Sequence, residues 1–155
     1  MNIGIIVYSQ SGHTLEVCEK LKERLAGKGH AVALNQITVV GGRTPKTRAF
    51  ELGSKPMVDA YDAVVFASSV EAFSLCPVMS RYLKHAGSLE GKQVACLVTQ
   101  QFPYPWMGGS RAIKQMKKLC QSKGAAARAA GIVNWAESRR ETTMAKAVDY
   151  LTNAF

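Results

Sequence analysis

Short apolar runs that alternate with amphipathic stretches constrain the fold of this chain more than any other feature of its sequence. Five runs rich in Val, Ile and Ala occupy residues 3–8, 31–37, 63–67, 94–98 and 129–133. Their length and composition are typical of parallel strands that are buried on both faces of a sheet. Between them, apolar residues recur every three or four positions, as they do on one face of a helix. The sequence therefore predicts a regular alternation of strands and helices.

This alternation predicts one α/β domain across residues 1–155. A chain of 155 residues with 47% hydrophobic residues is sufficient for one full core. Parallel strands require right-handed crossovers, so we expect helices on both faces of the sheet. The predicted fold is three-layered and doubly wound, with a five-stranded parallel sheet in the order 2-1-3-4-5. In such a fold, ligands bind at the carboxyl ends of strands 1 and 3, where the winding reverses.

Residues 38–57 do not follow the alternation. They contain the sequence GGRTPKTR and show only a weak helical pattern around residues 49–52. We expect a long or partly helical excursion in place of the second crossover. Arg43, Lys46 and Arg48 cluster there. They predict either a solvated charged loop or a site that grips an acidic partner or the phosphate of a pyridine nucleotide.

The loop after the first predicted strand has the features of an anion site. It consists of Ser9, Gln10, Ser11, Gly12, His13 and Thr14. It leads directly into a helix, so free backbone amides face outward, while Gly12 permits close approach and the hydroxyl groups add donors. The loop contains no Lys or Arg and lacks the GxxxxGK[ST] pattern of a P-loop. We predict that it holds a phosphate monoester; the alternative is an ordinary loop in which Thr14 caps the helix.

Two further loops at the same predicted edge combine polar and aromatic residues. The candidates after the third strand are Ser68, Ser69, Val70 and Phe73, and those after the fourth are Thr99, Gln100, Gln101, Phe102, Tyr104, Trp106, Gly108 and Gly109. A surface loop with this much aromatic area indicates a planar ligand, held between Phe73 and one ring of the later loop. The alternative is that Phe73 and Trp106 pack as hydrophobic plugs.

These motifs resemble those of the flavodoxin family. Residues 9–14 are similar to the family's phosphate loop, [ST]xTGxT, with Ser11 in place of the Thr, and residues 106–109 look like its Trp and Gly element beside the flavin. The resemblance implies a flavodoxin-like fold, non-covalently bound FMN and electron transfer, with no catalytic acid or base. It leaves open an FMN-dependent NAD(P)H or quinone oxidoreductase on the same fold. The loop after the third strand departs from the family because it has no glycine.

The charge of the chain bears on its partners. Twenty Lys and Arg against eleven Asp and Glu give a formal charge of +9. This charge is compatible with an acidic partner, an anionic ligand or a nucleic acid. No nucleic-acid recognition motif accompanies the lysines of residues 114–123. We therefore expect a redox partner protein with an acidic docking surface, with NAD(P)H as a further candidate and no nucleic acid.

The cysteines and the apolar runs exclude several other classes. The four cysteines are far apart and form no CxxC pair, so neither a metal site nor a disulfide scaffold is predicted. The cysteines are predicted to be reduced and partly buried; Cys76 directly precedes a predicted helix, which makes a redox-active thiol an alternative to plain packing there. No apolar run approaches the roughly 20 residues of a membrane helix, and Met1 leads straight into the first strand. We expect no membrane association and a cytoplasmic location.

Overall fold

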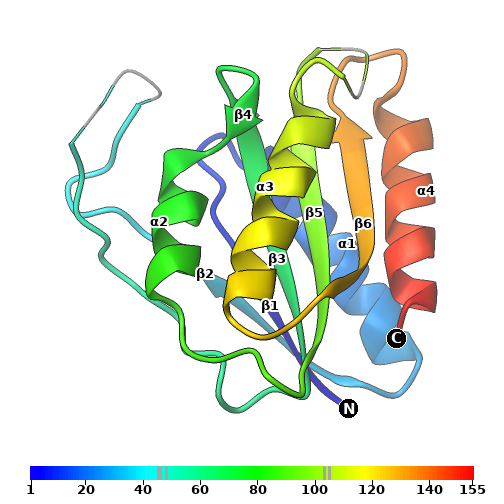
Figure 1. Ribbon diagram of the computed structural model, residues 1–155. Coiled ribbons are helices and arrows are strands. Elements are labelled where there is room, and N and C mark those ends of the chain that lie inside the picture. The colour runs from blue at the N-terminus through cyan, green and yellow to red at the C-terminus, as the bar shows by residue number, and fades with distance from the viewer. Residues whose placement is uncertain (45–46, 48, 103, 105) are drawn as a thin grey trace.

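Strands and helices alternate along the chain as the sequence predicts (Figure 1). The computed structural model describes residues 1–44, 47, 49–102, 104 and 106–155. In chain order the elements are β1 (Asn2–Val7), α1 (His13–Gly27), β2 (Ala31–Gln36), β3 (Ala63–Glu71), β4 (Ser74–Leu75), α2 (Pro77–His85), β5 (Gln93–Gln100), α3 (Gly109–Ser122), β6 (Ala127–Asn134) and α4 (Arg140–Asn153). Five strands form a parallel sheet in the order β2-β1-β3-β5-β6. This confirms the predicted strand order.

α2 and α3 cover one face of the sheet, and α1 and α4 cover the other (Figure 1). Successive residues of a strand point to opposite faces, so Ile5 of β1 packs with α1 and α4, and Ile6 packs with α2 and α3. Both side chains are fully buried, and each such burial stabilises the fold by about 1.5–3 kcal/mol. None of the helices in the described part of the chain is long and apolar enough to cross a membrane.

The connection from β2 to β3 contains no helix among its described residues. It is the long excursion that the sequence predicts, but the helical pattern at residues 49–52 forms no helix. Leu52 instead forms an isolated antiparallel bridge with Val39. The guanidinium groups of Arg43 and Arg81 lie over the ring of Phe50, at 5.3 and 3.9 Å from its centre. These contacts hold the excursion beside α2, where Figure 1 shows it as the cyan trace.

An unpredicted hairpin extends β3 beyond the parallel sheet. β3 pairs with the short strand β4, and the turn between them consists of Ala72 and Phe73. Both residues have positive φ, 48° and 60°, although such two-residue turns favour Gly and Asn. Gly108 explains how the turn is held in place. A Cβ at Gly108 would lie 2.7 Å from Val70 Cγ1 and 2.9 Å from Phe73 Cα, so only glycine lets the start of α3 approach the turn this closely.

Candidate cofactor site

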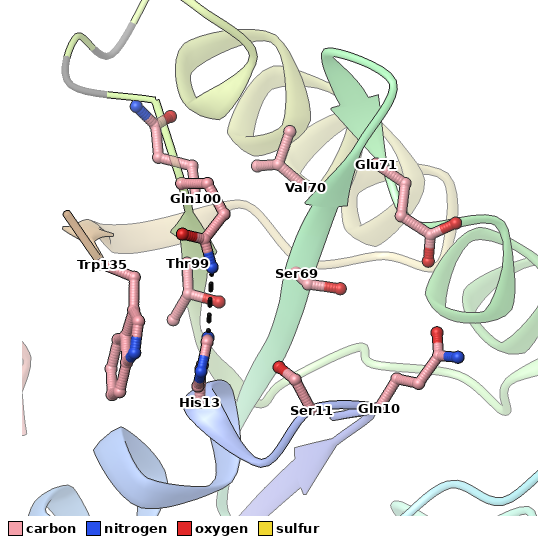
Figure 2. Close-up of a pocket in the computed structure, with 10 residues that line it drawn as sticks. Gln10, Ser11, His13, Ser69, Val70, Glu71, Thr99, Gln100 and Trp135 are labelled. Carbon is pink, nitrogen blue, oxygen red and sulfur yellow. Dashed lines mark hydrogen bonds between the residues drawn. The ribbon is translucent and has the colours of Figure 1, made fainter. Parts of the chain in front are cut away.

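A cavity of about 380 Å³ lies at the carboxyl edge of the sheet, where the strand order reverses between β1 and β3. It is lined by Gln10, Ser11, His13, Ser69, Val70, Glu71, Thr99, Gln100, Gln101 and Trp135. Figure 2 shows that these side chains converge from the ends of several strands and from the start of α1. Doubly wound sheets bind their ligands at this point. Eight of the predicted site residues are among the lining residues, which also include Glu71 and Trp135.

The start of α1 forms one side of the cavity, and its geometry suits an anion. Gly12 is the N-cap of the helix with φ 91°, and no side chain in the described part of the chain caps it. The Ser9 hydroxyl oxygen accepts a hydrogen bond from the Gly12 amide at 3.1 Å, which holds the turn. The first N–H groups of a helix have no partners within the helix, so they are available to an anion.

Thr14 does not cap α1, so that alternative is wrong. It lies within the first turn and is buried, and its Oγ1 is 2.8 Å from Thr99 Oγ1. This bond joins the start of α1 to the end of β5. Ser68 is also buried, and its hydroxyl donates to the carbonyl of Ser69 at 3.2 Å. Thr14 and Ser68, both predicted site residues, are therefore buried beneath the cavity lining and do not line it themselves.

His13 and Trp135 form a stacked pair in the cavity wall. Their ring centroids are 4.3 Å apart and their planes are 14° apart. Arg140 donates hydrogen bonds to the Trp135 carbonyl, and its guanidinium lies 4.7 Å from the centre of the Trp135 ring. Burial and the charge of Arg140 lower the pKa of His13.

Amide side chains hold the aromatic loop that follows β5. Gln100 Nε2 donates to the carbonyls of Phe102 and Tyr104 at 2.6 and 2.7 Å, and Asn134 Nδ2 donates to that of Phe102 at 2.8 Å. Gln100 Oε1 is buried and has no hydrogen-bond partner within the described residues. Gly108 is the N-cap of α3, and Gly109 begins the helix where any side chain would meet Gln100. The end of β5 thus sets the path of the loop.

Two stacked pairs of rings lie at the same edge. Phe73 and Phe102 have centroids 5.1 Å apart at 18°, and Tyr104 and Trp106 have centroids 5.8 Å apart at 5°. Their exposed fractions are 50%, 46%, 45% and 75%, so they form an exposed aromatic surface. Because Phe73 and Phe102 contact each other, a flavin between them would require the rings to separate by about 3.5 Å, the thickness of one ring.

Glu71 brings a carboxylate to the cavity wall, where a buried ion pair holds it. Arg43 Nη1 donates to Oε2 at 2.9 Å, and Arg43 Nη2 donates to Oε1 at 3.2 Å. The Arg43 side chain is only 1% exposed, so neither predicted role, a solvated loop residue or a grip on a phosphate, is correct for it. Lys46 and Arg48, predicted to act with it, lie outside the described residues.

Cys76 packs in the core, which is one of the two alternatives predicted for it, and is not a reactive thiol. It is fully buried, and its Sγ donates to Glu71 Oε2 at 2.8 Å. Burial and the carboxylate of Glu71 raise the pKa of Cys76 to about 12. No cluster of three or more His, Cys, Asp or Glu that could hold a metal occurs among the described residues.

We expect the folded protein to resist thiol labelling. All four cysteines are buried, so iodoacetamide at pH 8 should modify none of them in the folded state within minutes. Mass spectrometry after the same treatment in denaturant should show four modified thiols, which provides the control. Rapid modification of Cys76 in the folded protein would contradict its burial.

The signal that could have found Trp135 was present in the sequence. Trp135 follows β6 directly, and the carboxyl ends of parallel strands meet at one edge. Glu71 lies in the sequence between Val70 and Phe73, two residues that the sequence did predict as part of the site. Its ion pair with Arg43 had no sequence signal, because the path of residues 38–57 is not periodic.

Comparison with known proteins identifies the fold. No protein-family model matches the sequence, and no curated protein matches it. Flavodoxin 2 of Bacillus cereus has a TM-score of 0.72 at 19% identity, over 99% of this chain and 97% of that one. A WrbA-like flavodoxin of Agrobacterium tumefaciens has a TM-score of 0.70 at 14% identity, over 99% and 96%. A flavodoxin of Streptococcus pneumoniae TIGR4 has a TM-score of 0.67 at 14% identity, over 100% of both chains. The chain therefore has the flavodoxin-like fold.

Proposed function

We propose that this chain binds FMN non-covalently in the cavity and carries electrons between redox enzymes. The observation that carries the proposal is the two-sided cavity at the reversal of strand order. One side is an uncapped helix N-terminus with hydroxyl groups, which suits a phosphate. The other side includes Val70 and Glu71 of β3, Gln101 after β5 and the ring of Trp135, and the exposed rings of Phe73 and Phe102 stack beyond this lining; such aromatic surface suits a planar ring. FMN supplies the redox chemistry when bound, and the chain supplies binding and electrostatics.

The residues of the cavity fit the phosphate of FMN without a cation. The described residues that line it include no Lys or Arg, and burial lowers the pKa of His13. The amides of the first turn of α1 and the hydroxyl of Ser11 are the donors available to a phosphate at this side. A helix N-terminus favours a nearby anion by about 0.3–2 kcal/mol, in addition to the hydrogen bonds that its amides donate.

Titration of the apo-protein with FMN and with riboflavin tests the proposal. We expect saturable one-to-one quenching of FMN fluorescence. Riboflavin should bind at least about tenfold more weakly, because it lacks the phosphate and loses charge-assisted hydrogen bonds of about 1.5–3 kcal/mol each. Failure of FMN to bind would contradict the proposed function. Equal affinity for the two flavins would contradict the role of the α1 loop while leaving flavin binding in place.

The charge of the chain supports an acidic partner because the cations are segregated. α2 and α3 carry Arg81, Lys84, Arg111, Lys114, Lys117 and Lys118, and neither helix contains Asp or Glu. α1 and α4 lie on the other face, and in each of them the Lys and Arg residues equal the Asp and Glu residues in number. Arg111 lies in the first turn of α3, so this basic face begins at the edge where the cavity opens. An acidic partner would dock there.

Charge reversal on α3 is expected to slow electron transfer to an anionic oxidant. With FMN bound and reduced, the wild type should reduce ferricyanide at a rate that falls as ionic strength rises, because opposite charges attract. Arg111→Glu with Lys114→Glu should lower that rate by about tenfold at low salt and weaken its salt dependence. Stopped-flow absorbance gives both quantities.

Lys22→Glu with Lys146→Glu provides the matched control for this charge reversal. Both lysines are exposed on α1 and α4, and the pair changes the net charge by the same amount on the opposite face. We expect this variant to keep most of the wild-type rate. Equal slowing in the two variants would show that the net charge matters and the α3 face does not.

An FMN-dependent NAD(P)H or quinone oxidoreductase is the second candidate. It is favoured by the exposed rings of Tyr104 and Trp106, on which a nicotinamide or a quinone can stack. Anaerobic mixing of the FMN-loaded protein with NADH and with NADPH separates the two functions. An electron carrier stays oxidised on this timescale, whereas rapid bleaching of the flavin absorbance would assign a reductase.

A further inference from the structure

Arg43 connects three segments, of which the α1 loop and the β3–β4 hairpin contribute residues to one side of the cavity. Its backbone carbonyl accepts a hydrogen bond from Gln10 Nε2 in the α1 loop. Its guanidinium holds both carboxylate oxygens of Glu71 on the β3–β4 hairpin. Its Nη1 also lies 3.7 Å from Cys76 Sγ at the start of α2. Figure 2 shows Gln10 and Glu71 on the same side of the cavity.

The ion pair has an electrostatic role because it is almost completely withdrawn from water. The side chains of Arg43 and Glu71 are 1% and 12% exposed. In such surroundings the interaction between charges is screened far less than in solvent. Glu71 is one of the residues that line the cavity, so any charge left on its carboxylate would act on a bound ligand. A buried charge that loses its partner is costly, and the rest of the site then experiences its field.

We propose that Arg43 is a positioning residue that neutralises Glu71 and thereby sets how strongly the cavity prefers oxidised over reduced FMN. This inference rests on the proposed FMN function. The ring of FMN gains negative charge on reduction whenever it takes up fewer protons than electrons. An unpaired Glu71 carboxylate would repel this charge, and the ion pair with Arg43 removes the repulsion. The excursion of residues 38–57 thus contributes to the redox balance without contacting the cavity through the Arg43 side chain.

Dissociation constants of oxidised and reduced FMN, the latter measured anaerobically, test the proposal. We expect Arg43→Gln to raise the ratio of the dissociation constant of reduced FMN to that of oxidised FMN by about tenfold. This change corresponds to a two-electron potential that is lower by about 30 mV. Glu71→Gln should move the ratio in the opposite direction because it leaves the cation unpaired. The double variant should return the ratio to the wild-type value. Arg43→Lys keeps the charge and should stay within about threefold of wild type.

A purely structural role predicts a different pattern. Loss of shape alone would raise both dissociation constants by the same factor, would leave their ratio unchanged, and would not be reversed in the double variant. An unchanged ratio in Arg43→Gln, with FMN still bound by the wild type, would overturn the inference and leave the proposed function intact. Failure of the wild type to bind FMN would overturn both. If Arg43→Gln does not fold, Arg43→Lys and Glu71→Gln carry the test, and equal ratios in both would overturn the inference.

Discussion

Replacement of Gly12 by Asp is expected to weaken FMN binding by at least about a hundredfold. Gly12 is the N-cap of α1, and a Cβ there would meet no atom within 4 Å, so an Asp side chain has room beside the loop. Its carboxylate would accept hydrogen bonds from the backbone N–H groups that a phosphate needs, and its negative charge would repel the phosphate. Two unit charges about 5 Å apart in a partly exposed site repel by about 3 kcal/mol, more than a factor of a hundred in affinity. Fluorescence titration with FMN measures the loss.

Gly29→Asp is a closely matched control for this substitution. Gly29 has φ 94°, against 91° for Gly12, and a Cβ there would also meet no atom within 4 Å. It lies beyond the opposite end of α1, far from the cavity edge of the sheet. Both variants therefore add the same charge at a similarly strained backbone, but only Gly12→Asp places the charge beside the phosphate. If Gly29→Asp lowers the affinity equally, the α1 loop is not the phosphate site.

Substitution of Gly108 by Ala is expected to destabilise the apo-protein by about 3 kcal/mol. The new Cβ would clash with Val70 and with the backbone of Phe73, and Ala would have to adopt φ 121°. Overpacking costs about 1–3 kcal/mol, and backbone strain at such a φ adds a comparable amount. The hairpin turn and the start of α3 must then separate, so FMN affinity should fall as well. Urea unfolding followed by circular dichroism measures the change in stability.

Gly91→Ala separates backbone strain from the clash. Gly91 has φ 78°, and a Cβ there would meet no atom within 4 Å. It lies between α2 and β5, away from the cavity lining. We expect a loss of about 1–2 kcal/mol from strain alone and no change in FMN affinity. A loss as large as that of Gly108→Ala would show that the contact with the hairpin contributes nothing.

The layered fold and the α1 loop were predictable because local sequence determines them. Buried parallel strands appear as short apolar runs, and a strand followed directly by a Gly-containing turn and a helix indicates an anion site. The turn at Ala72 and Phe73 was not predictable, since neither residue favours positive φ. Its conformation depends on contact with Gly108, which only the folded chain brings near.

The ion pair between Arg43 and Glu71 was unpredictable for a related reason. Isolated charges in a polar stretch are usually solvated, and local sequence does not indicate which of them becomes buried. The burial of Arg43 follows from contacts with Phe50, Glu71 and Cys76, which are distant in the sequence or separated from it by a stretch without periodicity. Long-range geometry of this kind lies outside what hydrophobic periodicity can specify.

The connection between β2 and β3, which has no helix among its described residues, is expected to limit how fast the cavity can open. Its described residues have few of the repeating internal hydrogen bonds that protect helices, so their amides should exchange with solvent through local fluctuations, well before the sheet unfolds. Arg43 belongs to this connection, and each local opening withdraws its support from Gln10 and Glu71 together. If FMN binds as proposed, we expect its release to follow the opening of this connection and to proceed while the core stays intact.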